Sequence, residues 1–306
     1  MERKNLLERE KVSEILPYET LSSKTTVTVG RGHISLSGVQ VKYSAVIDKG
    51  AFRLTEPDEY GTYILKPILS DWYNREFSPA NENLTMQIAS QVYGIQTAEN
   101  AVCFTRNGEQ VYVTKRYDIK SDGTKIQQED FASLAGVTKE RYGYDYKYNA
   151  LDYTDIANII KKYIPAWRIE LIKYFDLILF NFVFANGDAH IKNFSVLQTP
   201  QGDYRLSPAY DLINSAIHIY SDSVFALQRG LFPGWNKELG AYGKDFIKFG
   251  ELIGLDENTV SKEIERFCII YDKTEELIEK SFLSEKLKKE YRTIYHTRIN
   301  SFLKVL

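Results

Sequence analysis

The side chains best suited to chemistry are concentrated in residues 184–194, which read F-A-N-G-D-A-H-I-K-N-F. The preceding residues, 174–184, are almost continuously apolar, and this pattern predicts a buried helix. Placing an aspartate, a histidine, a lysine and an asparagine straight after a buried helix costs desolvation free energy unless they line a cleft or bind a cation. We therefore interpret residues 184–194 as a candidate functional site.

The spacing of two residues in this segment indicates the kind of chemistry. Asp188 and Asn193 are five residues apart, which is the separation between the base and the metal-binding amide in phosphotransferase catalytic loops. In such loops the aspartate orients an attacking hydroxyl and the asparagine helps to hold Mg²⁺. Because Mg²⁺ usually takes one or two carboxylates as well as phosphate oxygens, a second carboxylate is expected further along the chain.

Asp211 meets this expectation. It lies in S-P-A-Y-D-L at 207–212, beyond a hairpin-like segment, 193–207, with P-Q-G-D at its turn. The order along the chain is therefore base, amide, hairpin, carboxylate. The alternative is that residues 186–188 form a plain turn and Asp211 caps a helix, because D-x-x-x-x-N alone is a weak motif.

The elements that must position these groups begin with a β-rich region. Short apolar runs separated by glycines predict an antiparallel sheet. The expected strands are Thr25–Val29, Val39–Ile47, Ala51–Leu54, Thr62–Lys66, Ala101–Thr105 and Gln110–Thr114. K-R-Y-D at 115–118 then leaves the sheet, and this exit is the expected hinge whose backbone could bind adenine.

Lys66 ends one of these strands, in Y-I-L-K-P. In a kinase-like lobe a lysine at this place reaches the α- and β-phosphates and is oriented by a glutamate of the next helix. That helix is predicted over 79–94, with proline at its start and glycine at its end, and Glu82 is the candidate partner. A glutamate favoured by the helix dipole is the alternative for Glu82.

A loop rich in glycine and serine, G-R-G-H-I-S-L-S-G at 30–38, joins two of the expected strands. Glycine permits close approach of backbone to a phosphate, and serine hydroxyls and amides can cradle its oxygens. The loop is not a Walker A motif, because no G-K-[ST] follows the last glycine. A purely structural hairpin loop is the alternative.

The remainder of the chain is predicted to be mostly helical. A first helix is expected over 6–16, ending at Pro17. The others are expected at 129–134, 154–163, 167–185, 242–253, 258–270, 273–282 and 285–303. The last one carries a basic face, which is either simply solvated or a phosphate contact. The tyrosine-rich residues 142–149 are expected to form an ordered surface loop rather than a platform for bases.

Composition limits the class of protein. The chain has 306 residues, 43% of them hydrophobic, which is enough for one two-lobed unit or two packed domains. The net charge of −2 gives no overall attraction to nucleic acid. Cys103 and Cys268 are most simply buried thiols of a reducing compartment. Because neither a signal peptide nor a bilayer-spanning run is recognisable, we expect a cytoplasmic protein.

Taken together, several motifs resemble those of the HipA family, the bacterial serine/threonine kinases that act as toxins of toxin–antitoxin systems. They are S-L-S-G-V-Q-V-K at 35–42, I-L-K-P at 64–67, K-R-Y-D at 115–118, Q-E-D-F at 128–131, N-G-D-A-H-I-K-N-F-S at 186–195 and P-A-Y-D-L at 208–212. The resemblance covers roughly residues 25–270. It implies an α+β, two-lobed protein-kinase-like fold, with a β-rich N-lobe over 25–118 and a helical C-lobe over 119–306, after an N-terminal extension, 1–24.

The resemblance implies ATP and Mg²⁺ as cofactors, with Asp188 and Lys66 as the catalytic residues. Asp188 would be the catalytic base, and Asn193 and Asp211 would be the metal ligands. Lys66 would bind the phosphates, with Glu82 as its partner.

Further residues would contact the nucleotide. His190 would lie beside it, Lys192 would help to offset the charge of the triphosphate, and Lys115 and Tyr117 would supply hinge contacts to adenine. The residues of the loop over the phosphates would be Ser35, Leu36, Ser37, Gly38, Val39 and Gln40. Ser35 or Ser37 would be autophosphorylated.

The resemblance extends to partners. The S-x-S pattern at 35–37 and the short stretch before the loop are similar to the HipT type, which lacks the N-terminal subdomain of longer members. Expected partners are a HipB-like DNA-binding antitoxin, a HipS-like small protein, or both, with DNA reached only through the antitoxin and no membrane contact. The substrate would be a protein of the translation machinery, such as an aminoacyl-tRNA synthetase. Nothing in the residues selects one substrate, partner or oligomeric state.

Two rival functions stay open on the sequence. A small-molecule phosphotransferase would share the arrangement of Asp188, Asn193 and Asp211 but should show an acidic pocket in its helical lobe. A corepressor-type binding module would act on DNA with an antitoxin and need no catalysis.

Overall fold

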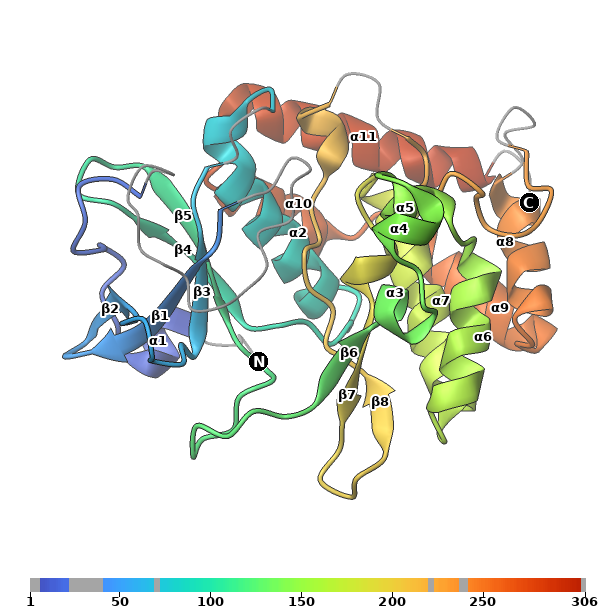
Figure 1. Cartoon of the computed structure of the whole chain (residues 1–306). Coiled ribbons are helices and arrows are strands. Elements are labelled where there is room, and N and C mark those ends of the chain that lie inside the picture. The colour runs from blue at the N-terminus through green and yellow to red at the C-terminus, as the bar shows by residue number, and fades with distance from the viewer. Residues whose placement is uncertain (1–5, 22–40, 69–71, 220–222, 237–241, 304–306) are drawn as a thin grey trace.

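Two lobes lie side by side in the computed structural model of the chain, one β-rich and one larger and mostly helical (Figure 1). The structure describes residues 6–21, 41–68, 72–219, 223–236 and 242–303. The first lobe contains a five-stranded sheet and the second begins with a small three-stranded one. The α+β, two-lobed architecture predicted from the sequence is confirmed.

The large sheet has the strand order β2-β1-β3-β5-β4, and all neighbouring strands are antiparallel. Its strands are β1 (Tyr43–Asp48), β2 (Ala51–Leu54), β3 (Tyr63–Lys66), β4 (Asn100–Phe104) and β5 (Gln110–Lys115). Each matches a predicted strand closely, although β1 begins later than expected. The strand predicted over 25–29 lies outside the described residues.

The N-terminal segment differs from its prediction. Helix α1 (Leu6–Glu10) ends six residues before Leu16, because Lys11 adopts a left-handed φ of 53°. The following residues run extended along the edge strand β4, where the Leu16 N–H donates to the Phe104 carbonyl at 2.8 Å. Pairing with an open sheet edge satisfies backbone groups that a longer helix would leave exposed on β4. Leu6, Leu7 and Leu16 are buried in the core of this lobe.

The helices of the second lobe agree with their predictions within a few residues. They are α6 (Tyr153–Tyr163), α7 (Trp167–Val183), α8 (Tyr242–Leu252), α9 (Glu257–Phe267), α10 (Asp272–Lys280) and α11 (Glu285–Leu303). Local signals explain where two of them begin. Asp152 and Asp155 form a reciprocal capping box at the start of α6, and Asp256 caps α9.

Short elements complete the second lobe around the candidate site. The strands β6 (Gln128–Asp130), β7 (Ser195–Gln198) and β8 (Tyr204–Leu206) form the small sheet, and β7 and β8 are the predicted hairpin. The helices are η1 (Arg75–Phe77), α3 (Phe131–Leu134), α4 (Lys139–Tyr142), α5 (Tyr146–Asn149), η2 (Ile191–Asn193) and η3 (Ser215–Ile217). The strand β6, the helices α4 and α5 and the three η helices were not predicted, because elements this short carry no clear periodicity. Residues 129 and 130 were expected to begin a helix and belong to β6 instead.

Helix α2 (Ser78–Gln91) lies between the lobes, with the proline and the glycine of its predicted ends in place. Its buried residues Leu84 and Ile88 belong to the same apolar cluster as α7 and α11. The Thr85 hydroxyl lies 2.9 Å from that of Tyr291 on α11. Glu82 is thus carried by a helix that is anchored in the helical lobe while it faces the sheet.

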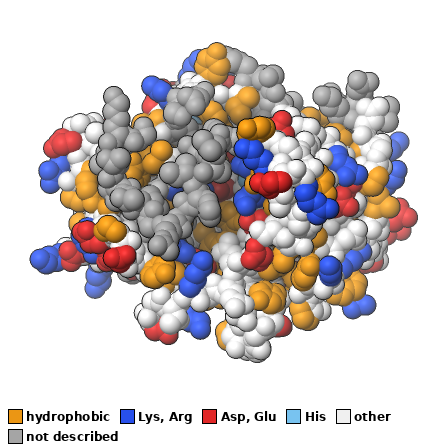
Figure 2. Space-filling model, in the orientation of Figure 1, with side chains coloured by type: hydrophobic (Ala, Val, Ile, Leu, Met, Phe, Trp, Pro, Cys, Tyr) orange, Lys and Arg blue, Asp and Glu red, His pale blue; other side chains and the backbone are white. Residues whose placement is uncertain are grey.

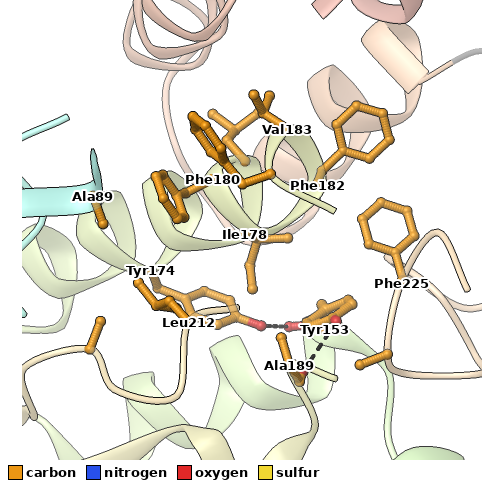
Figure 3. Packing of buried hydrophobic residues seen from close by; sticks show 14 of the residues in the cluster. Ala89, Tyr153, Tyr174, Ile178, Phe180, Phe182, Val183, Ala189, Leu212 and Phe225 are labelled. Atoms are coloured by element: carbon orange, nitrogen blue, oxygen red, sulfur yellow. Dashed lines mark hydrogen bonds between the residues drawn. The ribbon is translucent and has the colours of Figure 1, made fainter. Parts of the chain in front are cut away.

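An aromatic core packs against the loop that carries the candidate site residues. Phe182 of α7 and Tyr153 both pack against Phe225, with ring centroids 5.8 Å apart in each pair, whereas Phe180 is directed to the other side of α7 (Figure 3). In the same view the Tyr174 hydroxyl donates to the Tyr153 carbonyl at 2.9 Å, and the Tyr153 hydroxyl donates to the Ala189 carbonyl at 3.4 Å. Residues 174–184 are therefore a buried helix, as predicted, and their packing fixes the loop that follows.

Charged side chains of both signs lie next to one another over the helical lobe in the face seen in Figure 2. The basic face of α11 is partly neutralised by α10 and by its own first turn. Arg292 and His296 lie 2.5 and 2.8 Å from Glu275, and Lys288 lies 2.8 Å from Glu285. These contacts favour the interpretation of this face as an ordinary solvated surface. Within the described ranges, no helix combines the length and apolarity that a bilayer crossing requires.

His218 links the segment after Asp211 to the residues before α2. It is buried, its Nδ1 lies 2.8 Å from the Tyr73 carbonyl, and its own carbonyl accepts from the Tyr73 N–H at 3.2 Å. Burial lowers the pKa of His218 below its ordinary 6.5, although the bond to Tyr73 and the charge of Glu76 oppose the shift. Such a group binds its proton mainly in the unfolded chain, so acidification below pH 6.5 destabilises the fold.

We expect His218→Asn to reduce this acid sensitivity, since the asparagine Nδ2 stands at about the place of the histidine Nδ1, can still donate to the Tyr73 carbonyl and does not titrate. Below pH 6.5 the free energy of unfolding of the wild type should fall by up to about 1.4 kcal/mol per pH unit more than that of the variant. Urea denaturation at several pH values between 5 and about 7.5 measures the difference. Parallel pH profiles for the two proteins would contradict the expectation.

Candidate active site

The loop between α7 and β7 is shaped by asparagine side chains. The Asn186 N–H donates to the Asn181 carbonyl at 2.8 Å, and its side-chain Nδ2 donates to Asn181 Oδ1 at 3.0 Å. Asn186 Oδ1 in turn accepts from the Asp188 N–H at 3.3 Å. Residues 186–188 therefore do form a turn, and that turn places Asp188 at the exit of a buried helix.

The segment after Asp211 holds the same loop from the other side. The Ser215 hydroxyl accepts from the Gly187 N–H at 2.7 Å and donates to the Ala185 carbonyl at 3.0 Å. Ala185 adopts a left-handed φ of 49°, an uncommon conformation for alanine that such surroundings must enforce. Together with the hydrogen bond from the Tyr153 hydroxyl to the Ala189 carbonyl (Figure 3), these bonds leave the loop little freedom.

Asp188 and Asn193 lie together. Asn193 Nδ2 donates to the Asp188 backbone carbonyl at 2.9 Å, while the Asn193 N–H donates to the His190 carbonyl at 2.8 Å. The amide group is thereby oriented, and its Oδ1 accepts no hydrogen bond from the part of the chain that the structure describes. Asn193 thus presents an oriented oxygen of the hard type that Mg²⁺ prefers.

Asp211 is placed by a pairing between distant segments. Ala209 donates its N–H to the Gln96 carbonyl at 2.8 Å and accepts from the Ala98 N–H at 2.9 Å. Asp211 itself has a left-handed φ of 56°, which turns the chain sharply at this residue. Its function is therefore not that of a helix cap, since no helix of the described chain begins beside it.

Lys66 connects two carboxylates. Its ammonium lies 2.6 Å from Glu82 Oε1 and forms a second, short ion pair with Asp211 Oδ1. The side chains of Lys66 and Glu82 are only 3% and 5% exposed, against 28% for Asp211. Lys42 approaches the other oxygen of Asp211 at 3.5 Å. The structure therefore brings Lys66, Glu82 and Asp211 into one charge cluster between the lobes.

The electrostatics of this cluster follow from two anions sharing one buried cation. Burial would raise the pKa of Asp211, but Lys42 and Lys66 outweigh it and hold that pKa well below its usual range. Burial would lower the pKa of Lys66, but Asp211 and Glu82 outweigh it and raise that pKa. At Glu82 burial prevails over Lys66, so its pKa is raised. Asp211 is thus the firmly ionised carboxylate, and Glu82 is the less fully compensated one.

His190 interacts electrostatically with an aspartate of each of these two groups, Asp188 and Asp211. Its pKa is lowered by burial, which outweighs the charges of Asp188 and Asp211, so the ring is neutral near pH 7. Its Nδ1 is buried and has no hydrogen-bond partner among the described residues. A buried polar atom without a partner is costly, and at a site of this kind it indicates a ligand or a water. That His190 lies beside a nucleotide stays a prediction, and the unpartnered Nδ1 is the atom that such a ligand would contact.

Lys192 lines a polar cavity of about 310 Å³ on the hinge side of the site. The other lining residues are Asp118, Lys125, Gln128, Glu129, Asp130, Ser195 and Tyr210. Lys192 is 2.8 Å from Asp130 Oδ2, and the Tyr210 hydroxyl donates to the Lys192 carbonyl at 2.9 Å. The lysine expected to offset phosphate charge is therefore already paired with a carboxylate here.

The two predicted hinge residues have different surroundings. The side chain of Lys115 is directed toward α1, where its ammonium lies 2.6 Å from Glu10. The Tyr117 hydroxyl instead accepts from Gln128 Nε2 at 3.1 Å, and its ring lies 6.1 Å from that of Tyr210. Tyr117 thus contacts two of the residues that line the cavity, Gln128 and Tyr210, but does not line it itself. Ser35, Leu36, Ser37, Gly38, Val39 and Gln40, predicted to cover the phosphates, lie outside the described residues.

Sequence reasoning missed three residues that organise this site. Tyr148 of α5 donates its hydroxyl to Asp188 Oδ1 at 2.7 Å, although residues 142–149 were expected to form a surface loop. Asn81, next to Glu82, donates to the Asn214 carbonyl at 2.8 Å and accepts from the Asn214 N–H at 3.2 Å. Ser215 is the third. A polar residue at 81 in an otherwise buried helix was a usable signal, whereas nothing local marks Tyr148.

Comparison with protein families shows where the chain belongs. The model of the HipA-like C-terminal domain matches residues 34–274, most of the chain. The chain belongs to this family. The resemblance drawn from the motifs is thereby confirmed at the level of the family, while assignment to the HipT type stays a prediction. All of the predicted site residues of this HipA-like protein fall inside the matched region.

Curated relatives of this HipA-like protein carry kinase names. A Haemophilus influenzae protein named "Putative kinase" is 27% identical over 290 residues, which cover 88% of this chain and 82% of that protein. "Putative kinase Y4mE" of Sinorhizobium fredii is 30% identical over 190 residues. That match covers 60% of this chain and 43% of the longer relative.

Solved structures of two bacterial proteins share the fold. HipA of Shewanella oneidensis, solved with HipB and its operator DNA, matches with a TM-score of 0.67 and 19% identity. The match covers 92% of this chain and 67% of that one. The proinflammatory kinase CtkA of Helicobacter pylori matches with a TM-score of 0.55 and 13% identity, covering 89% and 92%. At sequence identities of 19% and 13%, these two matches show that the present chain shares their fold and nothing more.

Proposed function

We propose that this protein is an ATP-dependent kinase that phosphorylates serine or threonine hydroxyls of a protein. The observation that carries the proposal is that two clusters of side chains both lie within electrostatic range of His190. One cluster is Lys66 with Glu82 and Asp211, and the other is Asp188 with Asn193. Each cluster contains one aspartate, Asp188 or Asp211, whose charge acts on the ring of His190. Phosphoryl transfer needs this combination of positioning and charge compensation more than it needs covalent chemistry.

The donor set fits Mg²⁺ bound to a triphosphate. Asp211 offers an ionised carboxylate and Asn193 an oriented amide oxygen, and both are hard oxygen ligands. These two residues would hold the ion, which when bound offsets the negative charge of the phosphate oxygens. Lys66, oriented by Glu82, would exchange part of its contact with Asp211 for the phosphates. The orphaned Nδ1 of His190 would gain a partner beside the nucleotide.

In the proposed reaction a serine or threonine hydroxyl attacks the γ-phosphorus of ATP. The new oxygen–phosphorus bond forms as the bond to the oxygen bridging the β- and γ-phosphates breaks, and ADP leaves. Asp188 accepts the proton of the attacking hydroxyl. Its position on a loop fixed by Ser215 and Tyr153 suits this role, since small misplacements of a reacting group are costly in rate.

We also propose the biological setting. The Shewanella protein was solved with HipB and operator DNA, and this supports a HipB-like antitoxin as a partner of the present chain. A HipS-like small protein, a substrate in the translation machinery such as an aminoacyl-tRNA synthetase, autophosphorylation of Ser35 or Ser37 and a cytoplasmic location complete the proposal. DNA would be reached through the antitoxin, which agrees with the neutralised pairs on α11.

Phosphoproteomics of a bacterial lysate tests the proposed function. The lysate is incubated with ATP, Mg²⁺ and either the wild type or Asp188→Asn, and phosphopeptides are compared by mass spectrometry. We expect a small set of serine or threonine sites that appear only with the wild type, and phosphate on the peptide containing residues 35–37. Phosphate found only on small molecules would favour a small-molecule kinase. Identical phosphopeptides with both proteins would overturn the proposal.

A further inference from the structure

The contact between Tyr148 and Asp188 joins a short helix to the catalytic loop. The Tyr148 hydroxyl donates to Asp188 Oδ1 at 2.7 Å across 40 residues of sequence. Asp188 Oδ2 accepts no hydrogen bond from any residue within the described ranges. The two oxygens of the carboxylate are therefore in different situations, one held by the chain itself and one left to another donor.

Tyr148 is held firmly in this position. Its carbonyl accepts from the Gln228 N–H at 2.8 Å, and its N–H donates to the Asp145 carbonyl at 2.8 Å. Its ring packs edge-on against His190, with centroids 5.1 Å apart and an interplanar angle of 73°. Tyr148 also packs on the apolar core of the helical lobe. The hydroxyl is thus a fixed donor rather than one on a loosely held surface side chain.

The chemistry of the pair points in one direction. Burial and then the charge of Asp188 raise the pKa of Tyr148, so the phenol keeps its proton and can only donate to the carboxylate. The terminal torsion of an aspartate is broad, and a carboxylate without such a bond samples many orientations. A donor fixed on Oδ1 restricts this rotation and holds Oδ2 in one place.

We propose that Tyr148 is a positioning residue, which fixes the carboxylate of Asp188 so that Oδ2 receives the proton of the acceptor hydroxyl. This inference rests on the proposed kinase function, in which Asp188 is the base. Tyr148 takes no part in the bond changes. Its effect is to keep one oxygen of the base at a constant place relative to the phosphate being transferred, where a displacement of about 1 Å can cost up to about 10²-fold in rate.

The alternative to a positioning role is that Tyr148 inhibits the reaction. A hydroxyl bonded to the catalytic base occupies the kind of position that an acceptor hydroxyl must take, so Tyr148 could instead block the site. The two roles predict opposite results for Tyr148→Phe, which removes one oxygen atom and keeps the packing on His190. Removal of a blocking hydroxyl raises the rate, whereas removal of a positioning hydroxyl lowers it.

The experiment compares Tyr148→Phe with Tyr146→Phe, a half-buried tyrosine of the same helix with no hydrogen bond from its hydroxyl to the described chain. Initial rates of ³²P transfer from ATP into a fixed pool of lysate proteins are measured over a range of ATP concentrations. Affinity for the non-hydrolysable ATP analogue AMP-PNP with Mg²⁺ is measured by calorimetry. We expect Tyr148→Phe to lower kcat about 10- to 100-fold with KM for ATP and AMP-PNP affinity within about twofold. Tyr146→Phe should match the wild type.

A double-mutant cycle separates positioning from a general structural effect. In the Asp188→Asn background Tyr148→Phe should have no further effect on kcat, because no carboxylate remains to be positioned. Additive losses, a parallel loss of AMP-PNP affinity, or an unchanged or higher kcat for Tyr148→Phe would overturn the positioning role while transfer by the wild type persists. A wild type no more active than Asp188→Asn would overturn the proposed function itself and this inference with it.

Discussion

Replacing Asp188 by asparagine lowers the rate of phosphoryl transfer by about 10²- to 10⁴-fold, the range that a general base contributes. Asparagine matches aspartate in size, and the backbone carbonyl of residue 188 remains available to Asn193. The variant should therefore fold and bind nucleotide normally. What it loses is the carboxylate that accepts the proton of the attacking hydroxyl.

The measurement is ³²P incorporation at saturating ATP, with thermal unfolding and AMP-PNP affinity as controls. Asp58→Asn is a matched variant, since Asp58 is an exposed aspartate in the turn between β2 and β3. It should behave as the wild type in all three assays. Full activity of Asp188→Asn would show that another group acts as the base, and would remove the main support for the assignment of this loop.

Replacing Lys66 by methionine abolishes transfer and also destabilises the fold by about 3–5 kcal/mol, the cost of leaving a buried ion pair without one member. Lys66 is the cation shared by Glu82 and Asp211, and Glu82 is almost completely buried. Burial already raises the pKa of Glu82 in the wild type. An acid whose pKa is higher in the folded state than its ordinary 4.5 binds more protons when folded. The loss should therefore grow as pH rises above 4.5.

The double variant Lys66→Met with Glu82→Gln separates stability from activity. A neutral amide at residue 82 removes the uncompensated buried charge, so urea denaturation should show much of the lost stability recovered, whereas transfer stays absent. The recovery should be largest near pH 8, where Glu82 would otherwise be ionised. If the single Lys66→Met variant proves as stable as the wild type across this range, the buried pair contributes nothing to folding.

Helix and strand positions could be predicted well because their signals are local. The alternation in Ala51–Leu54 and the proline and glycine flanking residues 79–94 report on the few residues around them. The N-terminal helix was predicted too long, because a tertiary contact overrides the local pattern there. Residues 6–16 have helical spacing, yet the part from residue 14 onward gains more by pairing with the edge of β4 and burying Leu16 in the sheet's core.

The candidate site likewise has features that local sequence spacing reveals and features that depend on contacts between remote residues. The spacing of Asp188 and Asn193 and the presence of Asp211 after a hairpin were visible in the chain, because catalytic loops of this type keep their ligands at short separations. The sequence could not show that Lys115 turns toward Glu10, or that Lys192 is paired with Asp130. Those pairings join residues that are remote in sequence, and many charged residues could have served equally well as partners.

Reading the residues alone was enough to predict that a polar loop follows a buried helix, that an aspartate and an asparagine stand at the spacing of a phosphotransferase loop, and that a β-rich region precedes a helical one. The position of Lys66 between Glu82 and Asp211, and the bond from Tyr148 to one oxygen of Asp188, became known only from the fold. The difference lies in the range over which each signal acts. Propensity and periodicity act over a few residues, whereas these contacts depend on how α2, α5 and the segment after Asp211 pack on a common core.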